Sequence, residues 1–329
     1  MERAVLRAGR LFSLPGLFPF FSSMSGPSLP DRALGAYLGL AAGDALGATV
    51  EFMTPGEVAA EFRVHRQIVG GGWLHLKPGQ VTDDTQMCLA LGGALLARGG
   101  WDLRAGADAL VSWMRSKPVD IGNTCRRGIR RIMLEGSLCA EPAADSAGNG
   151  AAMRNLPIVL ATLGGASACR RATLEQAHLT HQHPLSDAAT LALARMTRLL
   201  LDGAGRDACR GAAEELVGEH AEFRFDPWPG RTSGYIVDTV QTVFDAFFHT
   251  SGFEDCLVTV VNRGGDADTT GALAGQLAGA LYGVQAIPVR WLKRLDPKVH
   301  AAIRAQVEGL LALAPARLQS PETQISGRL

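Results

Sequence analysis

The sequence is poor in aromatic residues and has no net charge. The first shortage argues against a β-sheet fold, and the second against binding to nucleic acid or an anionic membrane. Aromatic residues make up 6% of the 329 residues, whereas Ala, Leu and Gly are frequent. That mixture favours closely packed helices over sheets. The formal net charge is zero, which removes the electrostatic argument for binding nucleic acid or an anionic membrane. Because 47% of the residues are apolar, the chain can still bury a sizeable core.

Cysteine is present but follows no pattern that predicts a metal site. The six cysteines are scattered, without a C-x-x-C pair or a metal-type spacing to histidine. They favour a reducing, cytoplasmic location. No segment predicts a transmembrane helix, since the longest apolar stretch, after Thr270, is interrupted by Gln276.

The first 24 residues differ in composition from the rest. Arg3, Arg7 and Arg10 precede an apolar run at 11–21 that Pro and Gly interrupt. A signal peptide has this order, but an upstream start codon explains it too, with Met24 as the natural beginning. Since the cysteines argue against export, we expect residues 1–24 to be a mis-start or a disordered extension. Residues 25–315 would form the domain, and 316–329 a frayed tail.

Helical periodicity recurs along the chain, and alternating strand patterns are almost absent. No linker or solenoid repeat divides the sequence. It therefore predicts a single compact, orthogonally packed all-α domain. The predicted helices cover roughly 31–48, 84–98, 104–116, 122–134, 150–163, 172–181, 186–202, 206–219, 233–249, 253–262, 269–283 and 297–313.

Two of these helices carry glycine at every fourth position, which places the glycines on one face of each helix. They are Gly35, Gly39, Gly43 and Gly47 in the first helix, and Gly271, Gly275, Gly279 and Gly283 in the second. Each glycine costs about 1 kcal/mol of helix propensity relative to alanine. Close backbone approach would compensate, so we expect the two helices to cross in contact. If they run antiparallel, Glu51 lies beside residues 266–269.

Two short acidic segments carry the strongest chemical signal. Each places two carboxylates and neighbouring hydroxyls before an apolar helical pattern; they are Thr82-Asp83-Asp84-Thr85 and Asp266-Ala267-Asp268-Thr269-Thr270. Oxygen ligands without nearby His or Cys suit a hard cation such as Mg²⁺ or Mn²⁺. Either segment alone is equally well explained as a helix cap. Together, four carboxylates at two helix starts exceed what capping needs and predict one binuclear site.

Two adjacent divalent ions can polarise a substrate oxygen and activate water near neutral pH, which makes a hydrolase the expected class.

Asp120 and the Gly148-Asn149-Gly150 turn also precede helical patterns, and helix starts suit phosphate, although Gly-Asn-Gly alone is a weak signal. His181 and His183 lack a third soft ligand for zinc, so a helix-end loop or a substrate contact is the better interpretation. The sequence leaves undecided whether the side chains of Tyr235 and Trp73 lie in the core, at the rim of the site or as a platform under the substrate.

In combination, these segments resemble the ADP-ribosylglycohydrolase family. The motifs are Gly43-Asp44-Ala45-Leu46-Gly47 leading to Glu51, then Thr82–Thr85, Gly148–Gly150 and Gly264–Gly271. Their order and spacing match from Asp31 to Leu313, and the linked set is specific although each piece alone is not. The stretches 118–128, 180–188 and 235–239 resemble the branch of dinitrogenase reductase-activating glycohydrolases.

The resemblance implies an all-α fold with two divalent cations, Mn²⁺ or Mg²⁺, in a cleft. It implies removal of ADP-ribose from an arginine of ADP-ribosylated dinitrogenase reductase, which would reactivate nitrogenase. The implied metal ligands are Thr82, Asp83, Asp84, Asp266, Asp268 and Thr269. The implied catalytic residues are Asp120 as an acid/base or ribose-contacting group, Glu51 as a ligand or water-orienting base, and Asp83. The implied ADP-ribose contacts are Gly122, Asn123, Gly148, Asn149, Gly150, His181 and Tyr235.

The branch resemblance also implies a regulatory PII-type signalling protein and reversible membrane association through a partner. Two alternatives stay open. One is a hydrolase of ADP-ribosyl-serine or O-acetyl-ADP-ribose. The other is a non-catalytic ADP-ribose-binding protein, against which the intact carboxylates argue. The ligand types suit Mg²⁺ and Mn²⁺ equally.

The metal hypothesis predicts that Asp268→Ala abolishes hydrolysis of ADP-ribosyl-arginine and leaves the fold intact, because the substitution removes a metal ligand. Release of ADP-ribose measures the activity, and circular dichroism checks the fold. Normal turnover by a folded variant would refute the metal assignment.

Overall fold

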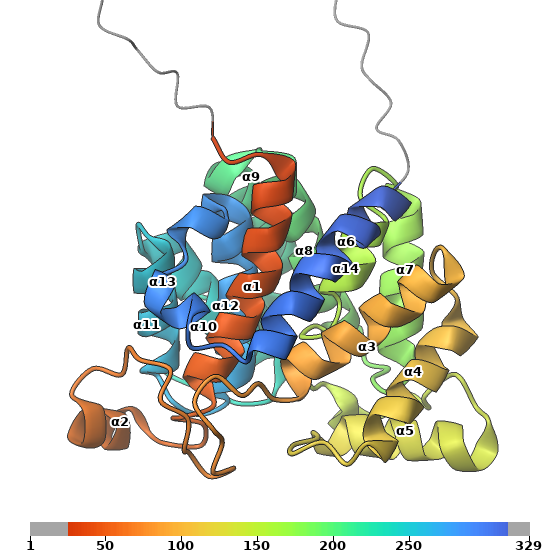
Figure 1. Cartoon of the computed structure of the whole chain (residues 1–329), viewed down its shortest axis with the longest axis horizontal. Coiled ribbons are helices and arrows are strands. Elements are labelled where there is room, and N and C mark those ends of the chain that lie inside the picture. Colours follow the sequence, from red (N-terminus) through yellow and green to blue (C-terminus); the bar gives the residue numbers. More distant parts are fainter. Residues whose placement is uncertain (1–25, 315–329) are drawn as a thin grey trace, which may run out of the picture.

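The computed structural model describes residues 26–314, and within that range the backbone forms helices with two isolated bridges and no β-strand (Figure 1). The predicted all-α class is therefore confirmed. The helices are α1 (Leu29–Gly47), α2 (Pro55–Phe62), α3 (Asp83–Arg98), α4 (Leu103–Arg115), α5 (Asn123–Glu135), α6 (Leu156–Ala161), α7 (Ala166–His178), α8 (Pro184–Leu201), α9 (Gly205–Glu219), α10 (Ile236–His249), α11 (Phe253–Val261), α12 (Ala267–Tyr282), α13 (Val289–Leu292) and α14 (Pro297–Leu313), with 3-10 turns at Ala144–Ser146, Ala221–Phe223 and Val284–Ala286.

Most predicted helices agree with the structure to within a few residues, and the exceptions have local causes. The helix predicted at 150–163 begins only at Leu156, because Pro157 fits a first turn and the preceding segment folds back on Asn149. The helix predicted at 172–181 begins earlier, at Ala166. Neither α2 nor α13 was predicted, although α2 opens with a capping box between Thr54 and Glu57.

The two glycine-lined helices, α1 and α12, pack against each other, as predicted, and they run in antiparallel directions. Gly39 faces Gly275, and a Cβ atom added at Gly275 would lie 2.0 Å from the carbonyl oxygen of Gly39. Gly43 faces Gly271 in the same way, and a Cβ atom added at Gly43 would lie 1.9 Å from the carbonyl oxygen of Gly271. Real Cβ atoms do not approach backbone so closely, so only glycine allows this contact between the two helices.

The glycine rows are not matched along their whole length. At the lower end Gly47 faces Ala267 rather than a glycine. At the other end Gly283 lies beyond the helix, as the C-cap of α12 with φ of 77°, and it packs against Pro27. Gly283 therefore caps the helix instead of forming its last turn, because its positive φ ends the helix there. It still lies on the predicted contact face, since a Cβ added at Gly35 would lie 2.7 Å from the carbonyl carbon of Gly283.

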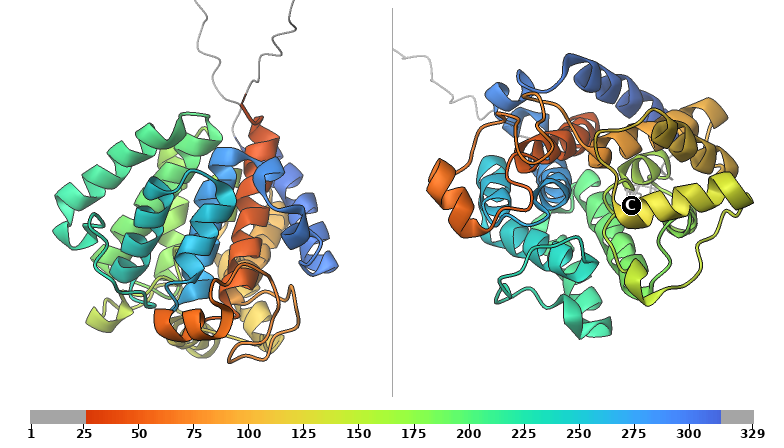
Figure 2. Two further views of the ribbon diagram at one scale, coloured as in Figure 1. Left: turned by 90° about the vertical axis from the view of Figure 1, so that its left-hand side faces the viewer. Right: turned by 90° about the horizontal axis from the view of Figure 1, so that it is seen from below.

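The antiparallel pair brings the end of α1 and the start of α12 to one end of the bundle. Hydrogen bonds from Phe52 N to Gly265 O (2.7 Å) and from Gly265 N to Met53 O (2.8 Å) join the two following loops. The start of α3 lies at the same end (Figure 1). Seen from below, α2 and α5 lie on opposite sides of this end (Figure 2).

An apolar core surrounds α1 and α12 and extends to α8, α10 and α11. A smaller cluster joins α3, α4 and α5 through residues such as Met87, Leu110 and Ile129. Helix α3 contributes to both clusters, with Met87 in the smaller one and Cys88 and Leu95 in the larger one. No helix within residues 26–314 is long and apolar enough to cross a membrane.

Gly275→Ala should lower the melting temperature markedly, because its Cβ must displace the backbone of α1. Gly211 is the matched control, since it lies in α9 and an added Cβ there meets nothing within 4 Å. Gly211→Ala should raise the free energy of unfolding by about 0.5–1 kcal/mol through helix propensity. Thermal unfolding measures the melting temperatures of the two variants, and denaturant unfolding measures their free energies of unfolding. Equal behaviour of the two variants would contradict the close-contact interpretation.

Candidate active site

A cleft of about 410 Å³ opens at the end of the bundle where α1 ends and α3, α5 and α12 begin. That volume is in the range of sites for small ligands. Most residues that the sequence predicted for the site line it. They are Glu51, Asp83, Asp120, Gly122, Asn123, Gly148, Asn149, Gly150, His181, Asp266, Asp268 and Thr269.

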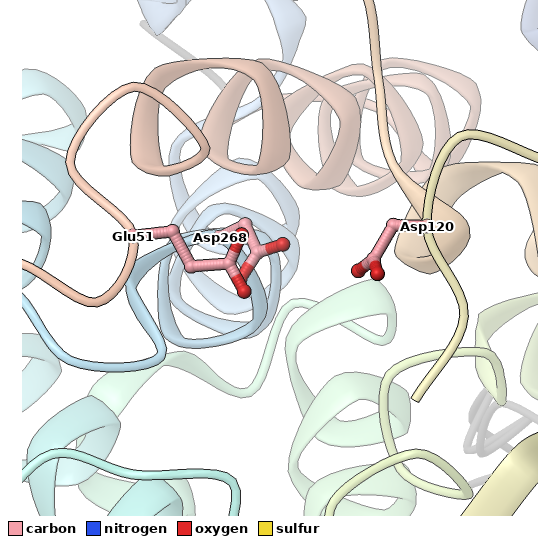
Figure 3. A group of neighbouring side chains, drawn as sticks. All are labelled: Glu51, Asp120 and Asp268. Carbon is pink, nitrogen blue, oxygen red and sulfur yellow. The ribbon is translucent and has the colours of Figure 1, made fainter. Parts of the chain in front are cut away.

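Carboxylates from distant parts of the chain meet in this cleft. Oxygen atoms of Glu51, Asp120 and Asp268 all lie within 4.8 Å of one another, and the same holds for Asp83, Asp84 and Asp268. Figure 3 shows the carboxylates of Glu51 and Asp268 side by side, with that of Asp120 pointing toward them from the opposite wall. Asp268 belongs to both groups, so the fold assembles one continuous acidic site from the two predicted segments.

Three of the four hydroxyl groups in the two acidic segments, those of Thr82, Thr85 and Thr269, point at carboxylates instead of capping their helices. Thr82 is the N-cap residue of α3, as predicted, but its side chain makes no capping hydrogen bond. Its Oγ1 lies 3.2 Å from Asp268 Oδ2 and 3.3 Å from Asp84 Oδ2. Thr269 Oγ1 donates to Asp84 Oδ2 at 3.3 Å. This arrangement argues against the simple capping explanation.

Burial and crowding favour the protonated forms of these carboxylic acids. Burial is the main cause that raises the pKa of Glu51 to about 8, despite the hydrogen bond that its Oε2 accepts from Trp73 Nε1. Burial, together with the charge of Asp120, raises the pKa of Asp83 to about 7. Burial likewise raises the pKa values of Asp84 and Asp268 well above the usual range.

The donor set fits divalent cations. Asp84 is fully buried, and its Oδ1 atom has no hydrogen-bond partner among the described residues. A buried carboxylate oxygen without a partner is costly, and a cation would satisfy it. Carboxylate and hydroxyl oxygens are also the ligands that Mg²⁺ and Mn²⁺ prefer. The acidic groups can therefore hold metal, and the number and identity of the ions remain predictions.

A second wall of the cleft is built from amide, glycine and histidine groups. Asn149 Nδ2 donates to Asp266 Oδ2 at 2.5 Å and to Thr239 Oγ1 at 3.0 Å, which holds the 148–150 turn against the acidic site. His181 packs beneath that turn, 3.0 Å and 2.9 Å from Cβ atoms built on Gly148 and Gly150. Glycine is needed there to make room for the imidazole ring.

His181 is held as a neutral ring. Burial and the nearby Arg154 guanidinium lower the pKa of His181 well below its usual value. Its Nδ1 lies 2.7 Å from Thr180 Oγ1, and Thr180 Oγ1 also accepts from the buried Arg154. His183 is the N-cap residue of α8, where its Nδ1 accepts a hydrogen bond from Leu185 N.

The start of α5 faces the cleft. Gly122 is its N-cap residue and makes no side-chain cap, but its N–H donates to Asp83 Oδ2 at 3.2 Å. That bond ties the segment of Asp120 and Asn123 to α3. Uncapped N–H groups at a helix start form a favourable environment for an anion.

Not every predicted residue lies on the cleft surface. Thr82 and Asp84 are fully buried beneath its floor. Tyr235 is 43% exposed and lines a neighbouring hollow, which shares Thr124 and Gly148 with the cleft. The structure thus places Tyr235 at the rim rather than in the cleft.

Asp44 is a site residue whose role sequence reasoning missed. It is fully buried, and its carboxylate accepts hydrogen bonds from Thr82 N, Thr82 Oγ1, Thr85 N and Thr85 Oγ1 at 2.6–3.1 Å. Burial raises its pKa to about 6, whereas these bonds oppose the rise. Asp44 therefore fixes the start of α3. Two sequence signals pointed to Asp44: its place in the Gly43–Gly47 motif, and a carboxylate within a largely apolar, glycine-lined helix.

An all-helical fold that gathers buried carboxylates, hydroxyls and free helix starts in one cleft defines a class of protein: a helical enzyme with a site suited to divalent cations. The profile of the ADP-ribosylglycohydrolase family matches residues 25–322, and the chain belongs to that family. The predicted family is confirmed.

Two curated relatives and one solved structure show how close the similarity is. The ADP-ribosyl-[dinitrogen reductase] glycohydrolase of Rhodospirillum rubrum is 58% identical over 291 residues, which cover 88% of this chain and 99% of the relative. An ADP-ribosylarginine hydrolase of Pseudomonas putida (strain GB-1) is 34% identical, covering 84% of this chain and 77% of the relative. A solved ADP-ribosylglycohydrolase-related protein complex matches with a TM-score of 0.76 and 36% identity, covering 88% of this chain and 99% of that chain.

Glu51→Gln should stabilise the metal-free protein more at about pH 8 than at about pH 5. The folded chain keeps the Glu51 proton up to about pH 8, whereas the unfolded chain loses it near 4.5. In that window the unfolded state binds fewer protons, so the free energy of unfolding falls as the pH rises. Glutamine does not titrate and still accepts from Trp73, so it removes this loss.

Melting temperatures in EDTA at both pH values measure this effect. Glu214→Gln is the control, because Glu214 is exposed on α9 and its variant should differ from the wild type equally at both pH values. A Glu51→Gln difference that stays flat or shrinks with rising pH would contradict the prediction.

Proposed function

We propose that this protein hydrolyses the N-glycosidic bond between ADP-ribose and an arginine side chain of ADP-ribosylated dinitrogenase reductase, and so restores that protein to activity. The observation that carries the proposal is the cleft itself: it joins the acidic group of Glu51, Asp120 and Asp268 to the uncapped start of α5 and the 148–150 turn. The 58% identical relative from Rhodospirillum rubrum, aligned over nearly its whole length, supports the choice of bond and protein substrate.

The two walls of the cleft suit the two ends of ADP-ribose. The diphosphate is anionic, so the free N–H groups at the start of α5 and the guanidinium of Arg126 would attract it. Asn123, Asn149 and the glycines at 122, 148 and 150 allow close approach of backbone donors to the nucleotide. Tyr235, at the rim, would contact the outer part of the ligand.

The reactive ribose would then lie against the carboxylates. Hydrolysis breaks the bond between ribose C1 and the guanidine nitrogen, transfers the water oxygen to C1, and returns a proton to the leaving nitrogen. Asp120 faces the acidic group from the opposite wall, and burial raises its pKa, which suits it to deliver that proton. Glu51, fixed by Trp73, would orient the attacking water, and Asp83 would hold the Asp120 segment in place.

Two divalent cations complete the proposal. Thr82, Asp83, Asp84, Asp266, Asp268 and Thr269 are the residues that would hold them. When bound, Mn²⁺ or Mg²⁺ supplies positive charge that neutralises the crowded carboxylates and polarises oxygen groups of the substrate. A PII-type regulatory partner, a cytoplasmic location and membrane association through a partner are further parts of the proposal that rest on the branch resemblance.

Hydrolysis of ADP-ribosyl-serine or O-acetyl-ADP-ribose is the competing function, and a substrate panel separates the two. The protein with Mn²⁺ should release ADP-ribose from modified dinitrogenase reductase and from ADP-ribosyl-arginine much faster than from either competitor. EDTA should abolish the activity, and added Mn²⁺ or Mg²⁺ should restore it. Preference for the serine or acetyl ester would contradict the proposed substrate, and full activity in EDTA would contradict the metal requirement.

A further inference from the structure

A second groove, of about 610 Å³, lies next to the catalytic cleft on the side of α2. The two hollows share Glu51, Phe52 and Trp73, so the groove continues from the acidic site onto the surface. Its further lining residues are Thr49, Met53, Glu57, Glu61, Phe62, Val69, Gly70, Gly71 and Gly72. Apart from Glu51 and Trp73, the residues that line this groove have no part in the proposed hydrolysis of the ADP-ribosyl-arginine bond.

The groove exposes apolar side chains where a protein surface normally would not gather them. Phe52 is 65% exposed, Trp73 49% and Val69 43%, and the rings of Phe52 and Trp73 lie 5.2 Å apart. Phe52 has φ of 64°, a backbone conformation unfavourable for a bulky residue, and its N–H is held by Gly265 O. A strained aromatic residue and a second exposed ring beside a reactive site indicate a contact surface for a partner.

The charged residues that line the groove are all of one sign. Outside the catalytic cleft these are Glu57 and Glu61, and no basic side chain is among the described lining residues. Hydrogen bonds from Thr54 lower the pKa of Glu57, which keeps that group ionised. A diphosphate would be repelled here, whereas a cationic chain would be attracted.

Together these features divide the surface at the acidic site. The nucleotide end of the substrate needs anion-binding groups, which lie on the side of α5 and the 148–150 turn. The leaving group is a guanidine on a polypeptide, and it must exit away from the nucleotide. The acidic, apolar groove starts at Glu51 and runs in the other direction, toward α2.

We infer that this groove binds the polypeptide segment that carries the ADP-ribosylated arginine, and that it selects segments with apolar and basic residues beside that arginine. The inference rests on the proposed function and extends it from the modified side chain to the protein that bears it. Phe52 and Trp73 provide apolar contacts where the groove joins the catalytic cleft, and Glu57 and Glu61 would attract basic residues beside the modified arginine.

The test compares two substrates that share the same scissile bond: ADP-ribosylated dinitrogenase reductase and free ADP-ribosyl-arginine. Glu61→Arg reverses a groove charge outside the catalytic cleft, near the C-terminal end of α2, where a positive charge is compatible with the helix dipole. With Mn²⁺ present, it should lower kcat/KM for the modified protein by roughly tenfold, since like charges across an interface are costly. Its kcat/KM for ADP-ribosyl-arginine should stay within about twofold of the wild type.

Two further variants complete the set. Val69→Ser removes an exposed apolar group from the groove and should also reduce kcat/KM for the modified protein alone. Glu214→Arg makes the same charge change on α9, which lies at the other end of the bundle from α2, and should affect neither substrate (Figure 1). Melting temperatures confirm that the variants are folded.

The possible results separate the inference from the proposed function. A wild type that releases ADP-ribose from neither substrate refutes the proposed function. A wild type that acts on both, with Glu61→Arg and Val69→Ser unchanged on the modified protein, overturns the groove inference and leaves the proposed function standing. Equal losses on both substrates also overturn it, because the groove would then act on catalysis rather than on the polypeptide.

Discussion

The backbone contact between α1 and α12 is the constraint on which the rest of the structure depends. Side chains larger than hydrogen at Gly39, Gly43, Gly271 or Gly275 would meet carbonyl oxygens of the facing helix at 1.9–2.5 Å. The antiparallel direction of the pair then places the end of α1 beside the start of α12. Glu51 and Asp268, more than two hundred positions apart in the sequence, become neighbours for that reason. The glycines thus lower the helix propensity of α1 and α12, but they allow the close contact that positions the site.

The site built on this contact is electrostatically unfavourable by itself. Buried carboxylates crowd together, and their pKa values rise because burial removes water and because neighbouring carboxylates repel one another. Hydrogen bonds hold the arrangement in spite of the repulsion: Asp44 anchors Thr82 and Thr85, and Asn149 is held on Asp266. These hydrogen bonds hold the carboxylates in place, and the site gains stability from any cation that neutralises it.

Sequence reasoning found the helices and the acidic residues because both depend on local signals. Periodicity and caps are short-range, so most helix ends were predicted within a few residues. It failed where tertiary contacts overrode the pattern. The segment before Leu156 looked helical but turns back to hold Asn149. The sequence left open whether Tyr235 lies in the core, at the rim or on a substrate platform, and the structure places it at the rim. The role of Asp44 was invisible, since its partners at Thr82 and Thr85 are about forty positions away.

The sequence by itself determined the helical class, the glycine faces, the family and the chemical nature of the site, because residue type and spacing encode them directly. Only the tertiary structure decided which carboxylates share a group, that Thr82 and Asp84 lie under the floor, and that an acidic apolar groove continues from Glu51 toward α2. Those facts depend on how helices cross and on which side chains lose contact with water. They are set by distances between segments that no local pattern records.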